Sequence, residues 1–427
     1  MRHAIQGWVR SFSRRVGDRF GHSRRPVVEG LEVRSLLSVA VAHDLVGHHH
    51  VAAHAAIGHV HAGPDAYSPF PDPARYGHQR FARERGGPNA YQQTNLVSDF
   101  PVGVEGVNPQ LQDTSLLNPW GLASGPKTPI WISDQVTGVS TLYSIGPNET
   151  VQKIPLTVKI PSSVTQPSQG FTPLTGPTGI VFNASGTGFD VNGSPSVYIF
   201  STLDGTLAGW NKASGTTAVV MASQAPAEEF TGLAMASSGG QTYLYTADPR
   251  LSPGIDVFNS SWSKVALAGN FVDPRLPAGM TPYNIQALDG HLFVAYIGAA
   301  QGGGAVAEFN TDGTFVRQLP PSGPAGPLQG PWGMAIAPSN FGHFSNDLLV
   351  GSFYDGRISA FNLGNGRFLG QLKSANGQPV VIPFLWGLDF GNGVSTGPTN
   401  SLLFTAGIAG QYHGLFGALM PTRPMRR

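Results

Sequence analysis

A short phrase recurs along this chain of 427 residues, and its spacing limits the fold more than any other feature. Six copies align on a Gly or Asn at positions 121, 179, 232, 284, 333 and 387, which are 58, 53, 52, 49 and 54 residues apart. The fullest copies read NPWGLA at 118–123, GPWGMA at 330–335 and FLWGLD at 384–389, and the weakest lies at 281–286. A period near fifty residues, with several short strands in each unit, is typical of a β-propeller. The repeat therefore predicts an all-β fold with six blades.

The strands expected within each unit also indicate how the ring closes. Each phrase is followed by further short runs of β-branched and aromatic residues, separated by Gly, Asp and Asn turns. The last unit ends soon after Leu419, without room for a fourth strand. The segment 92–98 lies before the first phrase and has strand character. We predict that this N-terminal strand completes the last blade, because closure removes the exposed edges of the ring.

Composition excludes several classes of site. The chain has no cysteine, which rules out disulfides, thiol catalysis, thiolate zinc sites and iron–sulfur clusters. Residues 91–421 hold 11 basic and 18 acidic residues, and this acidic balance would repel the phosphates of a nucleic acid. No run of eighteen apolar residues occurs, so no transmembrane helix is expected.

The composition divides the chain into four parts. Residues 1–38 are rich in arginine and are expected to form an export or targeting segment, and residues 39–90 form a low-complexity linker. The propeller is expected at 91–421, followed by a basic tail at 422–427. The linker is rich in histidine, at positions 43, 48, 49, 50, 54, 59, 61 and 78. Such a tract can bind Zn, Ni or Cu, but ordering it would cost entropy. We therefore interpret it as a disordered, solvated linker without an assigned metal.

Several motifs resemble those of a known family. They read TNLVSD at 94–99, LNPWGLA at 117–123, WISD at 131–134 and TGVSTLY at 137–143. Together they resemble a family of uncharacterised bacterial secreted β-propeller proteins, over about residues 91–421. The resemblance implies the fold but no established activity. More distantly, the blades are similar to NHL-type repeats, a group that includes binding scaffolds, lactonases and lyases.

A second resemblance concerns the N-terminal segment. Residues 31–38 read LEVRSLLS and resemble the LE-x-R-x-LLS element found near the N-terminus of many bacterial surface and secreted proteins. This resemblance implies export, and hence an extracellular or cell-surface location. The alternative is a disordered basic arm.

Candidate ligand-binding residues follow from the strand order. The second strand of a blade returns to the end at which the phrase begins, so the turn after it lies on the same face as the phrase. Aromatic residues of the phrases should therefore meet acidic residues of the turns. The candidates are Trp120, Asp134, Asp248, Trp332, Asp355 and Trp386. Rings beside carboxylates can hold a sugar, a cation or a peptide. The alternative is that the tryptophans pack between blades and the aspartates serve their turns.

Catalytic signals are weak. The histidines of the expected propeller, His291, His343 and His413, lie in no recognisable pattern. Residues 393–397 (GVSTG) match G-x-S-x-G, but Ser395 lies in a Gly-rich loop instead of the strand-to-helix turn that a nucleophile elbow needs. Glu228 and Glu229 are adjacent, so on a strand they would point to opposite faces. No catalytic residue is assigned.

Three functional hypotheses remain open. The first is an exported binding or cell-surface interaction module, monomeric and without a cofactor, whose small-molecule, glycan or protein ligand is unknown. The second is an enzyme similar to calcium-dependent lactonases or sugar dehydrogenases, with a calcium ion in the central channel, since calcium prefers hard oxygen ligands. The third is a structural envelope protein without a ligand.

Overall fold

The computed structural model describes residues 87–104, 106–162, 175–251, 253–298, 303–320, 322–323 and 326–422. The expected export segment lies outside these residues, as do most of the histidine-rich linker and most of the basic tail. Within the described part of the chain, no helix is long and apolar enough to cross a membrane.

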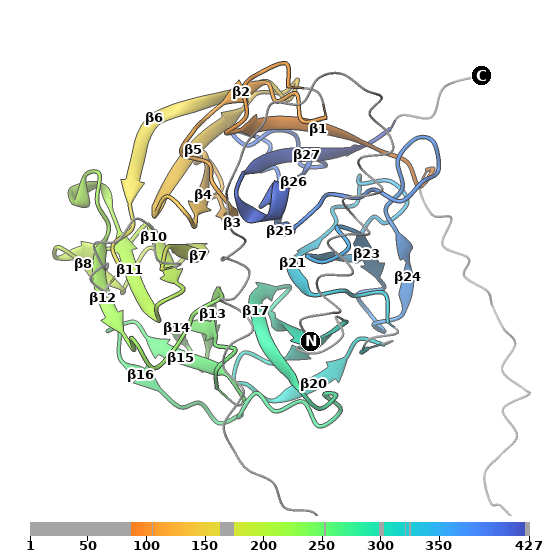
Figure 1. The fold of residues 1–427 in the computed structure, drawn as a ribbon. Coiled ribbons are helices and arrows are strands. Elements are labelled where there is room, and N and C mark those ends of the chain that lie inside the picture. Colours follow the sequence, from red (N-terminus) through yellow and green to blue (C-terminus); the bar gives the residue numbers. More distant parts are fainter. Residues whose placement is uncertain are drawn as a thin grey trace, which may run out of the picture. The chain divides into compact units, whose positions relative to one another are not determined.

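The described residues form a six-bladed β-propeller, as the repeat predicts (Figure 1). Blade 1 consists of β3 (Pro119–Ala123), β4 (Ile130–Asp134), β5 (Val139–Ile145) and β6 (Val151–Lys159). Blade 2 consists of β7 (Pro177–Phe182), β10 (Tyr198–Thr202), β11 (Thr206–Trp210) and β12 (Val219–Ser223). Blade 3 consists of β13 (Gly232–Ser238), β14 (Gln241–Ala247), β15 (Ile255–Asn259) and β16 (Lys264–Val265).

The other three blades repeat this order. Blade 4 consists of β17 (Met280–Leu288), β18 (His291–Gly298), β19 (Gly304–Phe309) and β20 (Phe315–Gln318). Blade 5 consists of β21 (Pro331–Ile336), β22 (Leu348–Ser352), β23 (Ile358–Phe361) and β24 (Phe368–Gln371). Blade 6 consists of β25 (Leu385–Phe390), β26 (Leu402–Ala406), β27 (Leu415–Pro421) and β1 (Tyr91–Ser98), with β2 (Leu111–Gln112) beyond β1. The ribbon β8 (Asp190–Val191) and β9 (Ser194–Pro195), a 3-10 turn (Lys212–Ser214) and α2 (Ile408–Gln411) lie outside the blades.

The N-terminal strand closes the ring, which confirms the prediction from the sequence. β1 pairs antiparallel with β27, from Tyr91 opposite Pro421 to Ser98 opposite Leu415 (Figure 1). Leu96 and Val97 are completely buried. Blade 6 therefore contains strands from both ends of the described chain, and its outer edge is not left open at β27.

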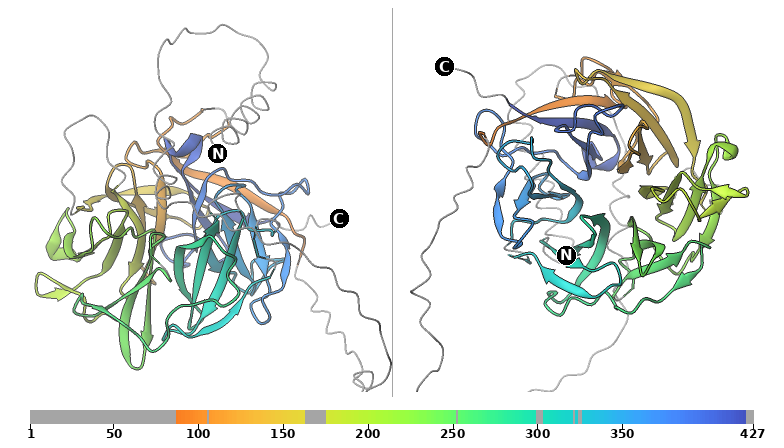
Figure 2. Two further views of the ribbon diagram at one scale, coloured as in Figure 1. Left: turned by 60° about the horizontal axis from the view of Figure 1, so that its bottom comes forward. Right: turned by 180° about the vertical axis from the view of Figure 1, so that it is seen from behind.

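The strand pairing defines two faces of the propeller. Pro119 pairs with Asp134 in blade 1, Gly232 with Ala247 in blade 3, and Pro331 with Ser352 in blade 5. The start of each inner strand therefore lies beside the turn between the second and third strands. We call this side the Trp face, because Trp120, Trp332 and Trp386 lie at these starts. The loops between first and second strands lie on the opposite face, and Figure 2 shows the ring tilted and from behind.

The Gly of the repeated phrase marks the closest approach of neighbouring inner strands. A Cβ atom added at Gly121 would lie 2.5 Å from the backbone oxygen of Thr178 in blade 2, and one at Gly179 would lie 2.5 Å from the backbone nitrogen of Leu233 in blade 3. No side chain fits at such distances. The fourth copy of the phrase has Asn284 in place of the Gly. Its Nδ2 donates a hydrogen bond to the backbone oxygen of Trp332 in blade 5, at 2.7 Å.

The hydrophobic core lies between adjacent blades. Trp131 of β4 stacks on Tyr198 of β10, with ring centroids 4.3 Å apart, and both side chains are buried. Between blades 4 and 5, Phe293 packs in one cluster with Met334 and Leu348. Each blade thus buries both faces of its sheet against its neighbours. This arrangement explains why the central strands read as almost continuous apolar runs.

Candidate functional site

The tryptophans predicted from the phrases meet at the centre of the Trp face. Trp120 and Trp386 are stacked, with ring centroids 3.7 Å apart, and Trp332 approaches both edge-on, at 6.0 and 5.8 Å. Tyr283 lies 5.9 Å from Trp386, and Phe353 lies 4.4 Å from it. These five rings come from blades 1, 4, 5 and 6 and form one cluster with Ile297. We call it the aromatic cluster.

The rings of the aromatic cluster fill space instead of presenting open faces. The exposed fractions are 5% for Trp120, 4% for Trp332 and 0% for Trp386. The indole N–H of Trp332 donates to the backbone oxygen of Thr231 at 3.1 Å, and that of Trp386 donates to Asn118 Oδ1 at 3.0 Å. The tryptophans therefore pack against other parts of the protein, which is the alternative to ligand binding given above. A ligand on this face can contact only the rim of the aromatic cluster.

A small cavity lies among the inner strands of the central channel. The centre of a water molecule can occupy about 30 Å³ of it, which is enough for about two waters. Its lining includes backbone and apolar side chains of several inner strands, Trp332, and the amides of Asn284 and Gln286. No carboxylate is among the described residues that line it. Gln286 is already engaged, because its Oε1 accepts a hydrogen bond from the backbone N–H of Met334 at 2.6 Å.

The turn aspartates differ in their surroundings. Asp134 is completely buried, and its Oδ2 accepts hydrogen bonds from the N–H and the hydroxyl of Thr141, at 3.0 and 2.8 Å. Burial raises the pKa of Asp134 well above its usual value. Asp355 is partly exposed and accepts a hydrogen bond from the N–H of Arg357 at 3.2 Å, and burial raises its pKa as well. Of the six candidates, only Asp355 therefore reaches solvent appreciably.

Asp248 belongs to an acidic cluster that the sequence did not reveal. Its carboxylate accepts hydrogen bonds from the N–H groups of Arg250 (2.7 Å) and Glu229 (3.2 Å). Oxygen atoms of Glu228, Asp248 and Asp256 lie within 4.8 Å of one another. Lys264 Nζ lies 2.6 Å from Glu228 Oε1 and 2.8 Å from Asp256 Oδ2. Burial, followed by the contact with Asp256, raises the pKa of Glu228 to about 7.

The residues considered for catalysis have structural partners. The hydroxyl of Ser395 donates to the backbone oxygen of Thr128 at 2.6 Å, and its N–H donates to Asn392 Oδ1 at 2.9 Å. His413 is paired with Asp99, with 2.6 Å between Nδ1 and Oδ2, and stacks on Phe100. The Ser395 hydroxyl thus ties the loop of blade 6 to blade 1 and is not set up as a nucleophile.

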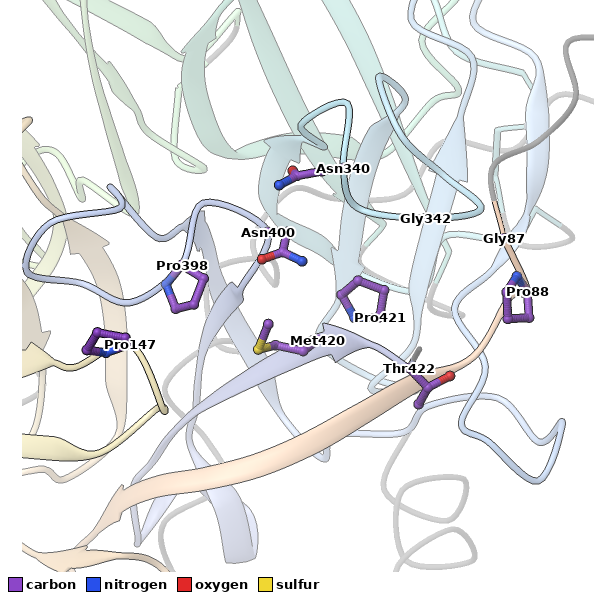
Figure 3. Close-up of a pocket in the computed structure, with 10 residues that line it drawn as sticks. All are labelled: Gly87, Pro88, Pro147, Asn340, Gly342, Pro398, Asn400, Met420, Pro421 and Thr422. Carbon is purple, nitrogen blue, oxygen red and sulfur yellow. The ribbon is translucent and has the colours of Figure 1, made fainter. Parts of the chain in front are cut away.

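A larger pocket opens on the opposite face, near the closure of the ring. Its volume is about 440 Å³. Figure 3 shows Asn340 and Asn400 on the loops of blades 5 and 6, with Met420 and Thr422 near the end of β27. Several prolines complete the lining, at positions 88, 147, 398 and 421. The pocket has no charged side chain among its described lining residues, so it offers shape and amide groups but no acid or base.

Comparison with known proteins places the chain among viral relatives. Protein R648 of Acanthamoeba polyphaga mimivirus is 31% identical over 333 residues, which cover 72% of this chain and 76% of the viral protein. Protein L690 of the same virus is 30% identical over 298 residues, covering 65% and 74% of the two chains. This chain belongs to their family. Both members are uncharacterised, and no family model matches the sequence. The bacterial origin expected from the motifs stays a prediction.

Solved structures show distant likeness only. A protein of unknown function from Bacteroides thetaiotaomicron is 12% identical, with a TM-score of 0.47 and coverage of 77% of this chain and 76% of the other. Virginiamycin B lyase from Staphylococcus aureus is 14% identical, with a TM-score of 0.42 and coverage of 78% and 99%.

Proposed function

We propose that this protein is an exported binding module whose ligand lies across the Trp face. The small size of the cavity among the inner strands is the observation that carries this proposal. It has room for about two water molecules, so an organic substrate does not fit in it, and we expect recognition to use the outer surface. The calcium-dependent enzyme considered above would need oxygen ligands in the channel, and there the described lining offers two amides and backbone.

The rim of the aromatic cluster supplies groups suited to a carbohydrate or peptide. Tyr354 follows Phe353 directly and is 45% exposed, and Asp355 follows Tyr354. Tyr412, in the turn before β27, is 59% exposed. An exposed tyrosine gives an apolar ring face with a hydroxyl at its edge, and a neighbouring carboxylate accepts hydrogen bonds. This combination matches the alternating apolar and hydroxyl surfaces of a sugar chain.

We expect Tyr354→Ala and Asp355→Ala to weaken binding by about tenfold each, which corresponds to ~1.4 kcal/mol. The measurement is a titration of the full chain against oligosaccharides selected on a carbohydrate array. Val316→Ser is the matched control, because Val316 is also exposed (39%) but lies on the outer strand β20. Equal binding by the rim variants and the wild type, or a ligand located on the opposite face, would contradict the proposal.

Export is the second part of the proposal, supported by the LE-x-R-x-LLS element at 31–38. We expect the full chain in the envelope or culture medium of the organism that encodes it, and a chain lacking residues 1–38 in the cytoplasm. Fractionation followed by immunoblotting measures this. Leu36→Arg and Leu37→Arg together should have the same effect as the deletion, and secretion of that variant at the wild-type level would argue against the element.

A further inference from the structure

We propose that the pocket on the face opposite the Trp face binds an uncharged, extended peptide segment of a partner protein. The pocket measures about 440 Å³, and ligand sites in proteins have volumes of about 300–1,000 Å³. The inference does not depend on the ligand proposed for the Trp face.

Two carboxamides from different blades give the pocket its chemistry. Asn340 lies in the loop between β21 and β22, and Asn400 lies in the loop between β25 and β26. Figure 3 shows both side chains at the pocket, together with Met420 and Pro421 of β27. Neither carboxamide is paired with another group of the described residues. Both therefore keep their donors and their acceptor for a ligand.

The loops hold both asparagines in place before a ligand binds. Phe341, which follows Asn340, is completely buried in the core. Ser401, which follows Asn400, is also completely buried, and its hydroxyl donates to Glu149 Oε1 at 3.2 Å. A site whose backbone is anchored in this way loses less conformational entropy when a ligand binds.

The lining favours a peptide over a sugar or an ion. A peptide unit presents an N–H and a carbonyl in one plane, and one carboxamide can pair with both. Prolines line the pocket at positions 88, 147, 398 and 421, and they add apolar surface without a backbone N–H that could compete. The described lining contains no aromatic ring on which a sugar could stack and no charged side chain that could pair with an ion. A charged peptide residue would lose its hydration there without gaining an opposite charge, so the peptide should be neutral.

The pocket also joins the two ends of the described chain, because Gly87 and Thr422 both line it. The N–H and the hydroxyl of Thr422 donate to the backbone oxygen of Ala90, at 2.9 and 3.0 Å. Asn89 connects this region to blade 5, because its Nδ2 donates to the backbone oxygen of Gln371 at 2.9 Å. A peptide that contacts both ends should therefore stabilise the closed ring and raise the melting temperature.

The test uses the full chain and an array of acetylated, amidated hexapeptides built from uncharged residues. Asn340→Asp combined with Asn400→Asp keeps the shape of both side chains but removes their N–H donors, so the affinity for a bound peptide should fall at least about tenfold. Replacing one residue of that peptide by Asp or Lys should weaken binding by about tenfold as well. Asn148→Asp is the matched control, because Asn148 is exposed in the turn after β5 and does not line the pocket.

The site would be overturned if no neutral peptide bound with a dissociation constant below about 1 mM, or if the double variant bound peptides as the wild type does. If the double variant does not fold, each single substitution answers the same question. Oligosaccharide binding at the rim should be unchanged in the double variant, because the rim lies on the other face. A double variant that loses the oligosaccharide instead of the peptide would show that the pocket binds the sugar, and would contradict both proposals.

Discussion

Deletion of Tyr91–Ser98 should cost the protein its soluble, cooperatively folded state. Without β1, the strand β27 loses its partner from Leu415 to Pro421 and becomes an open edge. The deletion also removes Tyr91, Leu96 and Val97, which are buried to 99% or more. At about 1.5–3 kcal/mol per buried apolar side chain, the loss takes up much of a typical stability of about 5–15 kcal/mol. Size-exclusion chromatography with light scattering, together with a thermal melt, measures the outcome.

Point substitutions in β1 distinguish the effect of losing its buried side chains from the effect of losing the strand itself. Leu96→Ala should lower the free energy of unfolding by about 2–4 kcal/mol, because it opens a cavity beside blades 1 and 6. Gln92→Ala and Gln93→Ala change exposed side chains of β1 and should have effects below about 0.5 kcal/mol. A soluble monomer with an unchanged melting temperature after the full deletion would show that β1 does not carry the closure.

The number of blades and the closure could be predicted because both depend on local and periodic information. The phrase recurs at a fixed interval, and the missing fourth strand of the last unit has a counterpart before the first unit. Because neighbouring strands of a blade run antiparallel, the strand order also decides which strand ends lie on the same face of the propeller. The pairing of Pro119 with Asp134 and of Pro331 with Ser352 follows from antiparallel order alone.

The burial of the tryptophans could not be predicted in the same way. The phrase places Trp120, Trp332 and Trp386 at one end of the ring, but whether they point outward depends on how closely the inner strands converge. A signal was available in the residue that follows each of them. Gly121 has no room for a Cβ atom because blade 2 lies against it. Where inner strands approach this closely, the neighbouring tryptophan rings have space only at the mouth of the channel.

The acidic cluster could not be predicted from the sequence either, for a different reason. Glu228, Asp256 and Lys264 come from a connection, a third strand and a fourth strand, and no motif links them. Glu228 and Glu229 lie in the connection between β12 and β13 and not on a strand, so the alternation expected for a strand does not apply to them. Glu228 binds Lys264 and Glu229 binds Arg250, so the two carboxylates serve different partners. Only the fold shows that one of them meets two further acids.

The aromatic cluster gives the second large expected effect. Trp386→Ala should lower the free energy of unfolding by about 3–5 kcal/mol, because a completely buried ring is removed from contact with Trp120, Phe353 and two further rings. Its loss also leaves Asn118 Oδ1 without the indole donor. At about 2–4 °C per kcal/mol for a large domain, the melting temperature should fall by about 6–20 °C.

Two controls show what the ring contributes. Trp386→Phe keeps an aromatic ring but removes the N–H group, so it should cost clearly less than Trp386→Ala. Tyr354→Ala lies at the exposed rim and should leave the melting temperature nearly unchanged while weakening carbohydrate binding. If Trp386→Ala melts like the wild type, the ring is not packed in the channel mouth, and the channel is open to a substrate after all. We expect Trp386→Ala to lose stability and Tyr354→Ala to lose only binding. That result would show that the buried ring stabilises the Trp face and that the exposed rim binds the ligand.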